Sequence, residues 1–516
     1  MTDRQRVLIR TALGIVLLAV ITHTRADPDL WGHVQFGRDI VSEATIPRLD
    51  PYAFTSDREW INHEWLAECA MYIAFAVGRG PGLVVLKVLV VFGMLALLWN
   101  GLKRQQVDPP TRDLLMALAV VGTFPQLNHV RPQVFSVLAF AALVWILESG
   151  GSARRLLLIP PLFAAWVNFH GGWIVGGGVL AIWTVLTLVS VRRGAPLDAP
   201  ARGGSAPGGS QDPPLHEGVL LLGAGAMALV GTLANPYGLR MWQFLTATVG
   251  FGRAEITDWQ PLYRLGAGYV ALWIVLSLAA IVGIMHAWRS RTWELRRLVL
   301  VAVLAVASFQ VSRLEAFFAI AVVLLLGPDI AAALRARRSP SSAPQATRRR
   351  FAAALTIVVV ATLIIGGVVV SASNVTCVRM AADQSEPEIV AMVKQRGLQG
   401  RLVVWFDWGE YAIWHFAPDL LVSIDGRRET VYSDQVMQKH LSFYYVPASR
   451  DAFLAETLPD YIWLPVDLPV VSNLVAEGWT PLYRGPRSIW LSRDATNPEP
   501  TQSSLADIGR RCFPGP

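Results

Sequence analysis

Apolar runs separated by short polar connections dominate the first 371 residues of the sequence. Several of these runs approach the ~20 residues that a helix needs to cross a hydrocarbon core of roughly 30 Å. We therefore predict a polytopic α-helical membrane domain, residues 1–371, with about eleven transmembrane helices. The predicted spans are residues 7–22, 82–99, 114–127, 133–147, 156–167, 173–191, 218–233, 268–288, 298–311, 317–334 and 351–370.

One further apolar run, residues 65–77, is short and is opened by Glu64 and Glu68. We interpret it as a juxtamembrane or re-entrant helix within a large first outer loop, residues 24–81. Counting it as a full span would place the basic connections outside. That arrangement contradicts the rule that cytoplasmic loops carry the excess of Lys and Arg.

Basic residues set the predicted orientation of the spans. If the N-terminus is cytoplasmic, every connection assigned to the inside contains a cluster of Lys or Arg. An odd number of spans then places residues 372–516 outside. The clusters include Lys103 and Arg104, Arg154 and Arg155, Arg192 and Arg193, Arg296 and Arg297, and Arg349 and Arg350.

The segment 372–516 has the character of a soluble domain. We predict a helix at 387–396 and strands at 401–406, 420–424, 461–464, 481–484 and 488–491, which suggests a small extracytoplasmic α/β domain. Cys377 lies near the start of this segment and Cys512 near its end. In an oxidising exterior they could form a disulfide, although spacing alone does not show that the two sulfur atoms meet.

Composition narrows the class of protein further. Hydrophobic residues make up 53% of the chain and charged residues 16%, and the mean hydropathy is +0.41. Soluble domains carry about 25% charged residues, so a soluble enzyme, a disordered chain and a fibrous protein are excluded. The net charge of +7 comes largely from residues beside the spans. It therefore predicts a lipid bilayer as the surroundings and no nucleic-acid partner.

Unusual polar residues lie at or near the outer ends of the predicted spans, and the inside connections show no comparable set. Polar and ionisable groups at membrane depth are costly, so they usually line a cavity or pair with one another. The candidate site residues are Asp27, Asp29, His33, His63, Glu64, His129, Arg131, Asn168, His170, Asp258, Trp259, Arg313 and Glu315.

These residue types suggest group transfer from a lipid phosphate. Asp27 or Asp29 could act as a general base or hold a divalent cation such as Mg²⁺ or Mn²⁺. Arg131 and Arg313 could clamp a phosphate with their forked donors. The histidines offer hydrogen bonds or proton transfer, and tryptophan can stack on a sugar ring. No ligand spacing is diagnostic of a metal site, so no metal-binding residues are predicted.

Structural interpretations remain open at this point. Asp27-Pro-Asp29 could be a turn and a helix cap, the arginines could form structural ion pairs, and each histidine could be structural. For turn-like residues of the tail, a structural role is the first interpretation and acceptor recognition is the alternative. These residues are Asp407, Asp425, Arg427 and Arg428.

Six short motifs and the layout of the chain carry a resemblance to the C superfamily of membrane glycosyltransferases (GT-C). This superfamily includes the lipid A aminoarabinose transferase and the protein O-mannosyltransferases. The motifs look most like those of a bacterial branch of that superfamily. They are residues 27–33 (Asp-Pro-Asp-Leu-Trp-Gly-His), 63–66 (His-Glu-Trp-Leu), 168–171 (Asn-Phe-His-Gly), 235–238 (Asn-Pro-Tyr-Gly), 407–411 (Asp-Trp-Gly-Glu-Tyr) and 424–427 (Ile-Asp-Gly-Arg).

The resemblance implies a mechanism. In this superfamily an aspartate of the first outer loop activates the acceptor, and the sugar arrives on a polyprenyl-phosphate carrier bound at the outer face. The usual Asp-Glu pair is here Asp27-Pro28, with Asp29 one residue further on, so either aspartate could be the base.

Our hypothesis is an inverting glycosyltransferase of the bacterial inner membrane that transfers a sugar from a polyprenyl-phosphate carrier to an envelope lipid, glycan or protein. Asp27 or Asp29 would be catalytic, and Arg131 or Arg313 would hold the donor phosphate. Two alternatives belong to other classes: a transporter or flippase of a lipid-linked saccharide, and a non-catalytic scaffold for envelope assembly. The expected substrate contacts are His33, His63, Glu64, His129, Asn168, His170, Asp258, Trp259 and Glu315.

Overall fold

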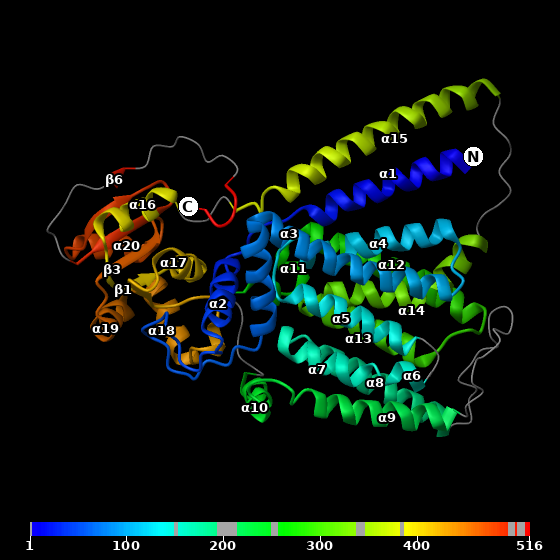
Figure 1. Ribbon diagram of the computed structural model, residues 1–516, viewed down its shortest axis with the longest axis horizontal. Coiled ribbons are helices and arrows are strands. Elements are labelled where there is room, and N and C mark those ends of the chain that lie inside the picture. Colours follow the sequence, from blue (N-terminus) through cyan, green and yellow to red (C-terminus); the bar gives the residue numbers. More distant parts are fainter. Residues whose placement is uncertain are drawn as a thin grey trace.

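The computed structural model places a bundle of long helices beside a smaller C-terminal α/β domain (Figure 1). It describes residues 3–148, 153–192, 214–248, 256–336, 346–381, 386–493, 501–502 and 511–515. A helix occupies each predicted span. These helices are α1 (Asp3–Thr22), α3 (Trp65–Arg104), α4 (Pro109–Leu127), α5 (Gln133–Leu147), α7 (Ile159–Phe169), α8 (Trp173–Arg192), α9 (Pro214–Gly231), α12 (Ala267–Arg289), α13 (Leu295–Gln310), α14 (Glu315–Ala336) and α15 (Ala346–Val375).

The chain is a multi-pass membrane protein. Within the described residues, five helical segments are long and apolar enough to cross a membrane by length and composition: Arg4–Thr22, Trp65–Arg104, Trp173–Ser190, Ala267–Arg289 and Ser312–Ala336. The part of each other bundle helix that the structure describes does not meet both criteria, so the count of about eleven spans stays a prediction.

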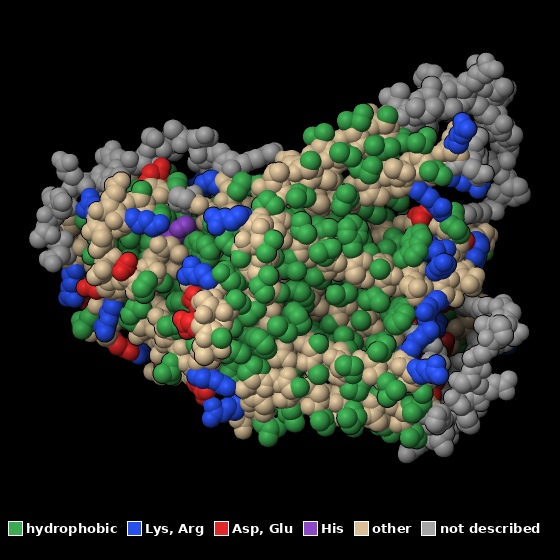
Figure 2. All heavy atoms as spheres, viewed as in Figure 1, with side chains coloured by type: hydrophobic (Ala, Val, Ile, Leu, Met, Phe, Trp, Pro, Cys, Tyr) green, Lys and Arg blue, Asp and Glu red, His purple; other side chains and the backbone are tan. Residues whose placement is uncertain are grey.

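Side-chain distribution over the bundle agrees with the predicted orientation. Apolar side chains cover its flank, and Lys and Arg gather at the end that lies away from the C-terminal domain (Figure 2). Cytoplasmic loops carry an excess of these residues. The cytoplasmic N-terminus and the extracytoplasmic C-terminal domain therefore stay predictions that this distribution favours.

Helix α3 joins the predicted juxtamembrane helix to the second span. Arg79 has a positive φ of 53°, and Pro81 follows it, so the helix kinks at this point. Residues 65–78 run across the ends of the bundle helices, and residues 80–104 run within the bundle (Figure 1). The run at 65–77 thus has the placement expected of a juxtamembrane segment.

Helix α14 forms the centre of the bundle. Almost all of its side chains from Ala316 to Leu326 are buried, and it packs against α4, α5, α12 and α13. A helix that is apolar all round suits such a central position. Helices α1 and α15 pack side by side along one flank (Figure 1).

The C-terminal domain contains a six-stranded sheet with the order β2-β1-β3-β5-β4-β6. Strand β1 pairs in parallel with β2 and β3, whereas β5 pairs antiparallel with β3 and β4. Each predicted strand is present, which confirms a small α/β domain. The strands are β1 (Gly400–Val404), β2 (Leu420–Val422), β3 (Tyr461–Pro465), β4 (Thr480–Arg484), β5 (Ser488–Ser492) and β6 (Thr501–Gln502). The helices are α16 (Pro387–Arg396), α17 (Gly409–Phe416), α18 (Asp434–Tyr445), α19 (Pro447–Thr457) and α20 (Pro469–Ala476).

The predicted first outer loop, residues 24–81, joins the bundle to the C-terminal domain. Its helix α2 (Leu30–Glu43), which the sequence reasoning did not predict, packs against both α3 and α17. Further along the loop, Tyr52 O accepts a hydrogen bond from Val422 N at 2.9 Å, and Phe54 N donates to Val422 O at 3.1 Å. The loop therefore continues the sheet beyond its β2 edge.

A disulfide between Cys377 and Cys512 ties the C-terminal residues to the start of the domain, with Cα atoms 5.2 Å apart. Beyond it, Phe513 is buried beside Trp31 and Phe75. The Trp31 indole donates a hydrogen bond to Pro514 O at 2.8 Å. The pairing that spacing alone left open is thus present, and it holds the tail against α2.

Replacing both Cys377 and Cys512 with serine should lower the thermal midpoint of unfolding. Removing a native disulfide costs about 2–5 kcal/mol, because the cross-link restricts the unfolded chain. Tryptophan fluorescence of the detergent-solubilised protein, with and without reductant, measures this. Reductant should lower the midpoint of the unmodified protein and leave that of the double variant unchanged. An equal shift in both would contradict the prediction.

Candidate active site

A cavity of about 530 Å³ lies between the ends of the bundle helices and the C-terminal domain. Ligand pockets in proteins have volumes of about 300–1,000 Å³. The α2 helix, the start of α3, the connections at the ends of the bundle and residues 426–430 of the C-terminal domain line this cavity. The structure brings these predicted site residues together in its lining: Asp29, His33, His63, Glu64, Arg131, His170, Asp258, Trp259 and Arg313.

Asp27 lies beneath the cavity lining and is only 2% exposed. Its carboxylate forms an ion pair with Arg131, which also pairs with Asp258. Asp27 Oδ1 accepts a hydrogen bond from Asp29 N at 3.0 Å, which fixes the turn before α2. Burial opposes ionisation of Asp258, but Arg131 and Arg313 outweigh it and lower its pKa. Asp27 is therefore committed to holding Arg131 and the turn.

Asp29 differs from Asp27 because its carboxylate faces the cavity and makes no ion pair or side-chain hydrogen bond with the described residues. Burial raises its pKa to about 6. The nearby carboxylates of Asp407, Glu64 and Asp258 act in the same direction, and His33 opposes them. A carboxylate with a pKa near neutrality and no bound partner suits a general base.

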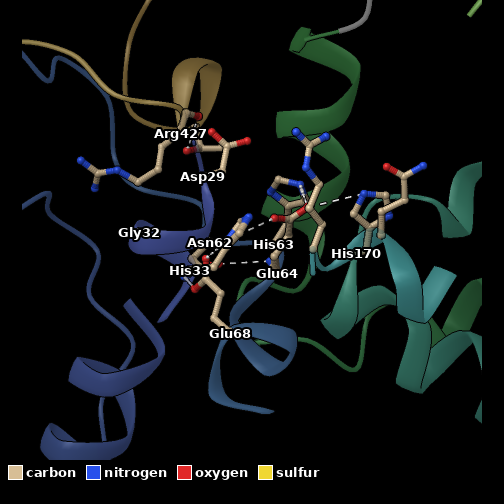
Figure 3. Close-up of polar contacts among 12 residues, drawn as sticks. Asp29, Gly32, His33, Asn62, His63, Glu64, Glu68, His170 and Arg427 are labelled. Atoms are coloured by element: carbon tan, nitrogen blue, oxygen red, sulfur yellow. Dashed lines mark hydrogen bonds and ion pairs between the residues drawn. The ribbon is translucent and has the colours of Figure 1, made fainter. Parts of the chain in front are cut away.

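Glu64 lies at the centre of a group of histidines (Figure 3). Its Oε1 atom is 3.5 Å from His63 Nε2 and 3.6 Å from His170 Nε2, and its Oε2 atom is 4.0 Å from His33 Nδ1. Burial opposes ionisation, but the three imidazoles outweigh it and lower the pKa of Glu64. The carboxylate is therefore ionised and can accept hydrogen bonds from these rings or from a ligand.

His33 also contacts Glu68, whose Oε1 lies 3.2 Å from His33 Nδ1. Burial opposes protonation of His33. The hydrogen bond to Glu68 and the charge of Glu64 outweigh burial and raise the pKa of the imidazole. Glu68 Oε2 accepts a hydrogen bond from the Asn62 amide at 2.6 Å. The sequence reasoning placed Glu68 only at a helix start, so its role as a partner of His33 was missed.

The tautomer of His170 follows from its hydrogen bonds. Its Nδ1 accepts from Gly172 N at 2.9 Å and lies 2.7 Å from the Ser136 hydroxyl. That hydroxyl accepts in turn from the Trp166 indole at 2.7 Å. Because Nδ1 is an acceptor, the neutral ring carries its proton on Nε2, the atom that faces Glu64. Burial lowers the pKa of His170 to about 3, so it acts as a neutral donor.

Arg313 carries a positive charge in the cavity lining. Among the described residues, no carboxylate lies within ion-pair distance of it. Its Nη2 donates to Gln133 Oε1 at 3.2 Å, and its guanidinium carbon lies 5.1 Å from the centre of the Trp259 ring. Arg131, by contrast, already holds two aspartates. An anionic group that enters the cavity would therefore meet Arg313 as the available guanidinium.

The remaining predicted residues lie outside the cavity lining. The Asn168 amide accepts from the Trp65 indole at 2.9 Å and donates to Ala164 O and Ala234 O, so it joins three segments of the bundle. His129 forms a β-bridge with Arg25, and burial lowers its pKa to about 4. Glu315 is fully buried at the start of α14.

Two acidic residues of the C-terminal domain have contacts that the sequence could not show. Asp425 pairs with Arg427, which also forms a bidentate ion pair with Asp50 of the first outer loop. These contacts agree with a structural role for Asp425 and Arg427. Glu410, within the motif at 407–411, accepts a hydrogen bond from Gly32 N at 3.1 Å. The sequence shows the motif, but Asp50 as the partner of Arg427 and Gly32 as the partner of Glu410 follow only from the fold.

One group of side chains has the composition of a divalent-cation site. His33 Nδ1 and carboxylate oxygens of Glu64 and Glu68 lie within 4.8 Å of one another. Imidazole and carboxylate ligands suit Zn²⁺ or Mn²⁺ better than Mg²⁺. The donor set fits such an ion, which would supply Lewis-acid chemistry when bound.

Comparison with solved structures identifies the fold. The crystal structure of ArnT from Cupriavidus metallidurans bound to undecaprenyl phosphate matches with a TM-score of 0.53 and 11% identity, covering 95% of this chain and 98% of that chain. The apo state of the same protein matches with a TM-score of 0.51 and 12% identity, covering 95% and 97%. The mycobacterial arabinofuranosyltransferase AftD has a TM-score of 0.49 and 12% identity over 96% of this chain and 42% of its own.

ArnT is a GT-C glycosyltransferase, and the alignment spans nearly the whole of both chains. This chain therefore has the fold of the GT-C membrane glycosyltransferases, as the motifs and layout implied. No protein-family model matches the sequence, and no curated protein matches it.

Proposed function

We propose that this protein is a membrane glycosyltransferase that transfers a sugar from a polyprenyl-phosphate carrier to an acceptor hydroxyl. The observation that carries the proposal is the pairing of Asp29 and Arg313 in one cavity of a GT-C fold. One is a carboxylate and the other a guanidinium, and neither forms an ion pair with the described residues. The ArnT structure with this fold is bound to undecaprenyl phosphate.

Asp29 acts as the general base in this proposal. It removes the proton from the acceptor hydroxyl, whose oxygen attacks the anomeric carbon of the donor. The bond between that carbon and the phosphate oxygen breaks, and polyprenyl phosphate leaves with the electron pair. Attack opposite the leaving group inverts the configuration of the sugar. Asp27 does not serve as the base, because it is buried against Arg131.

Arg313 binds the donor phosphate, and Arg131 supports it from the side of Asp258. Negative charge grows on the leaving phosphate in the transition state, so a fixed guanidinium there lowers the barrier. His33, His63, Glu64 and the neighbouring His170 and Trp259 then provide hydrogen bonds and a stacking surface for the sugar. Asn168 contributes by holding together the segments of the bundle that carry these groups.

The site would lie at the extracytoplasmic face of a bacterial inner membrane, and the acceptor would be an envelope lipid, glycan or protein. The gathering of Lys and Arg at the opposite end of the bundle supports this orientation (Figure 2). It also favours a transferase over a flippase, because the cavity lies at one end of the bundle and a transport path needs polar groups along its length.

The pH dependence of transfer tests the role of Asp29. The base must be ionised, and its pKa is about 6. We therefore expect kcat/KM to be constant above about pH 7 and to fall about tenfold per pH unit well below pH 6. Transfer measured from about pH 5 to pH 8, with acceptor titrated at each pH, gives this profile. A flat profile across that range would count against Asp29 as the base.

A further inference from the structure

Helix α2, which begins beside the proposed base, has an unusual cap. An N-cap aspartate ordinarily accepts a hydrogen bond from the backbone N–H two or three residues later. Asp29 occupies the N-cap position of α2, but its side chain makes no capping hydrogen bond. Gly32 N, the third N–H of the helix, donates instead to Glu410 Oε2 at 3.1 Å. The cap therefore comes from α17 of the C-terminal domain, 378 residues further along the chain.

Two glycines create the space in which Glu410 reaches α2. A Cβ atom on Gly32 would overlap the Glu410 carboxylate. A Cβ atom on Gly426 would overlap Asp29 Oδ1 and would lie 3.0 Å from Glu410 Oε1. The carboxyl groups of Asp29 and Glu410 thus both lie against Gly426, and a larger residue at Gly32 or Gly426 would displace at least one of them.

Glu410 is suited to cap α2 as a neutral, protonated side chain. It is 3% exposed and forms no ion pair with the described residues. Burial raises its pKa well above the usual range, and the charges of Asp29 and Asp425 act in the same direction. Of two neighbouring carboxyls, the less buried one ionises first. Glu410 therefore keeps its proton, and its carbonyl oxygen accepts from Gly32 while Asp29 carries the charge.

We propose that Glu410 is a positioning residue that caps α2 in place of Asp29 and so keeps the Asp29 carboxylate in the cavity. In the unmodified protein, Asp29 has a helical backbone (φ −81°, ψ −10°). Without Glu410, Gly32 N–H loses its acceptor, and Asp29 takes over the cap by turning to the extended conformation that an N-cap residue adopts. An Asp29 that caps its own helix is bound to a backbone donor and is no longer free to take a proton. The role of Asp29 as a general base rests on the proposed function. The replacement of the Glu410 cap by Asp29 does not depend on it.

Three variants separate this role from simple packing. Glu410→Met fills the same space but cannot accept a hydrogen bond. Glu410→Gln retains a neutral acceptor and should behave like the unmodified protein. Glu456→Ala removes an exposed carboxylate of the same domain and serves as the control. All of them leave the other charged groups that face Asp29 in place, which are His33, Glu64, Asp258 and Asp407.

The first measurement is the pH dependence of carbodiimide-driven amidation of Asp29, read by peptide mass spectrometry of the full-length protein in detergent. Protonated carboxyls react, so the midpoint of labelling reports the pKa. The unmodified protein, Glu410→Gln and Glu456→Ala should share one midpoint. In Glu410→Met the midpoint should fall by about one pH unit or more, because a backbone N–H stabilises the carboxylate. An unchanged midpoint in Glu410→Met overturns the proposal.

The second measurement is amide hydrogen exchange of peptides covering residues 30–34. Asp29→Ala keeps the Glu410 cap, and Glu410→Met gains the Asp29 cap, so both should exchange slowly at Gly32. The double variant has neither cap and should exchange at least about tenfold faster. Fast exchange at Gly32 in the single variant Glu410→Met would show that Asp29 does not replace the lost cap, and it would overturn the proposal. If Glu410→Met does not fold, Glu410→Ala replaces it. Neither readout uses a sugar donor, so their outcome is independent of the proposed transferase activity.

Discussion

Replacing Asp29 with asparagine should lower kcat/KM for sugar transfer by about 10²–10⁴-fold, the usual contribution of a general base. Asparagine has nearly the same shape but cannot take a proton at neutral pH. Because Asp29 forms no ion pair with the described residues, its loss should leave the fold intact. Initial rates and the thermal midpoint of the purified variant measure both effects.

Asp27→Asn is the matched comparison for this prediction. Asp27 is ion-paired with Arg131 and buried, so its replacement should disturb the position of Arg131 and lower stability. We expect the acid limb of the pH profile to persist in Asp27→Asn, because Asp29 still titrates there. Full activity in Asp29→Asn would show that the base is not Asp29. So would an acid limb that is lost in Asp27→Asn but kept in Asp29→Asn.

Arg313→Gln should lower kcat/KM by about 10²–10³-fold, the cost of removing one donor that stabilises charge in a transition state. The cation has no carboxylate partner within the described part of the chain, so its charge is available to the phosphate. Arg313→Lys should recover part of the loss, because it restores the charge but not the forked donors. The measurement is the rate at saturating acceptor with the donor concentration varied.

Arg264→Gln provides the control for Arg313. Arg264 is an exposed arginine on α11 (Leu262–Leu265), and it contacts Gln260 at 3.1 Å outside the cavity lining. The Arg264→Gln variant should retain transfer activity. Similar losses in Arg264→Gln and Arg313→Gln would indicate a general effect of positive charge and would contradict a phosphate site at Arg313.

The sequence predicted the elements whose pattern is local. Each apolar run of the membrane domain forms a helix, and the predicted helix at 387–396 coincides with α16. Helix α2 was missed although Leu30, Trp31 and Val34 recur at helical spacing, because Gly32 and Gly37 lie within it and glycine disfavours helices. Both glycines are close contacts, since a Cβ on Gly37 would overlap the backbone of Glu68. Packing against α3 and α17 stabilises this helix, and such packing is invisible to a local pattern.

The candidate site could be predicted in part for the same reason. Charged residues at the ends of spans pointed to Asp29, Arg131 and Arg313, and the fold brings them into one cavity. The choice between Asp27 and Asp29 required burial and ion pairing. The contribution of Glu410 required the docking of the C-terminal domain on α2, which follows from contacts between residues far apart in the sequence.

We propose above all that this protein consumes a polyprenyl-phosphate sugar. In the most direct measurement, the purified protein in liposomes is incubated with a panel of polyprenyl-phosphate sugars and acceptor extract. The release of polyprenyl phosphate is then followed. The unmodified protein should release it from at least one donor, and Asp29→Asn should not. Release from no donor by a folded protein, or equal release by both proteins, would contradict the account.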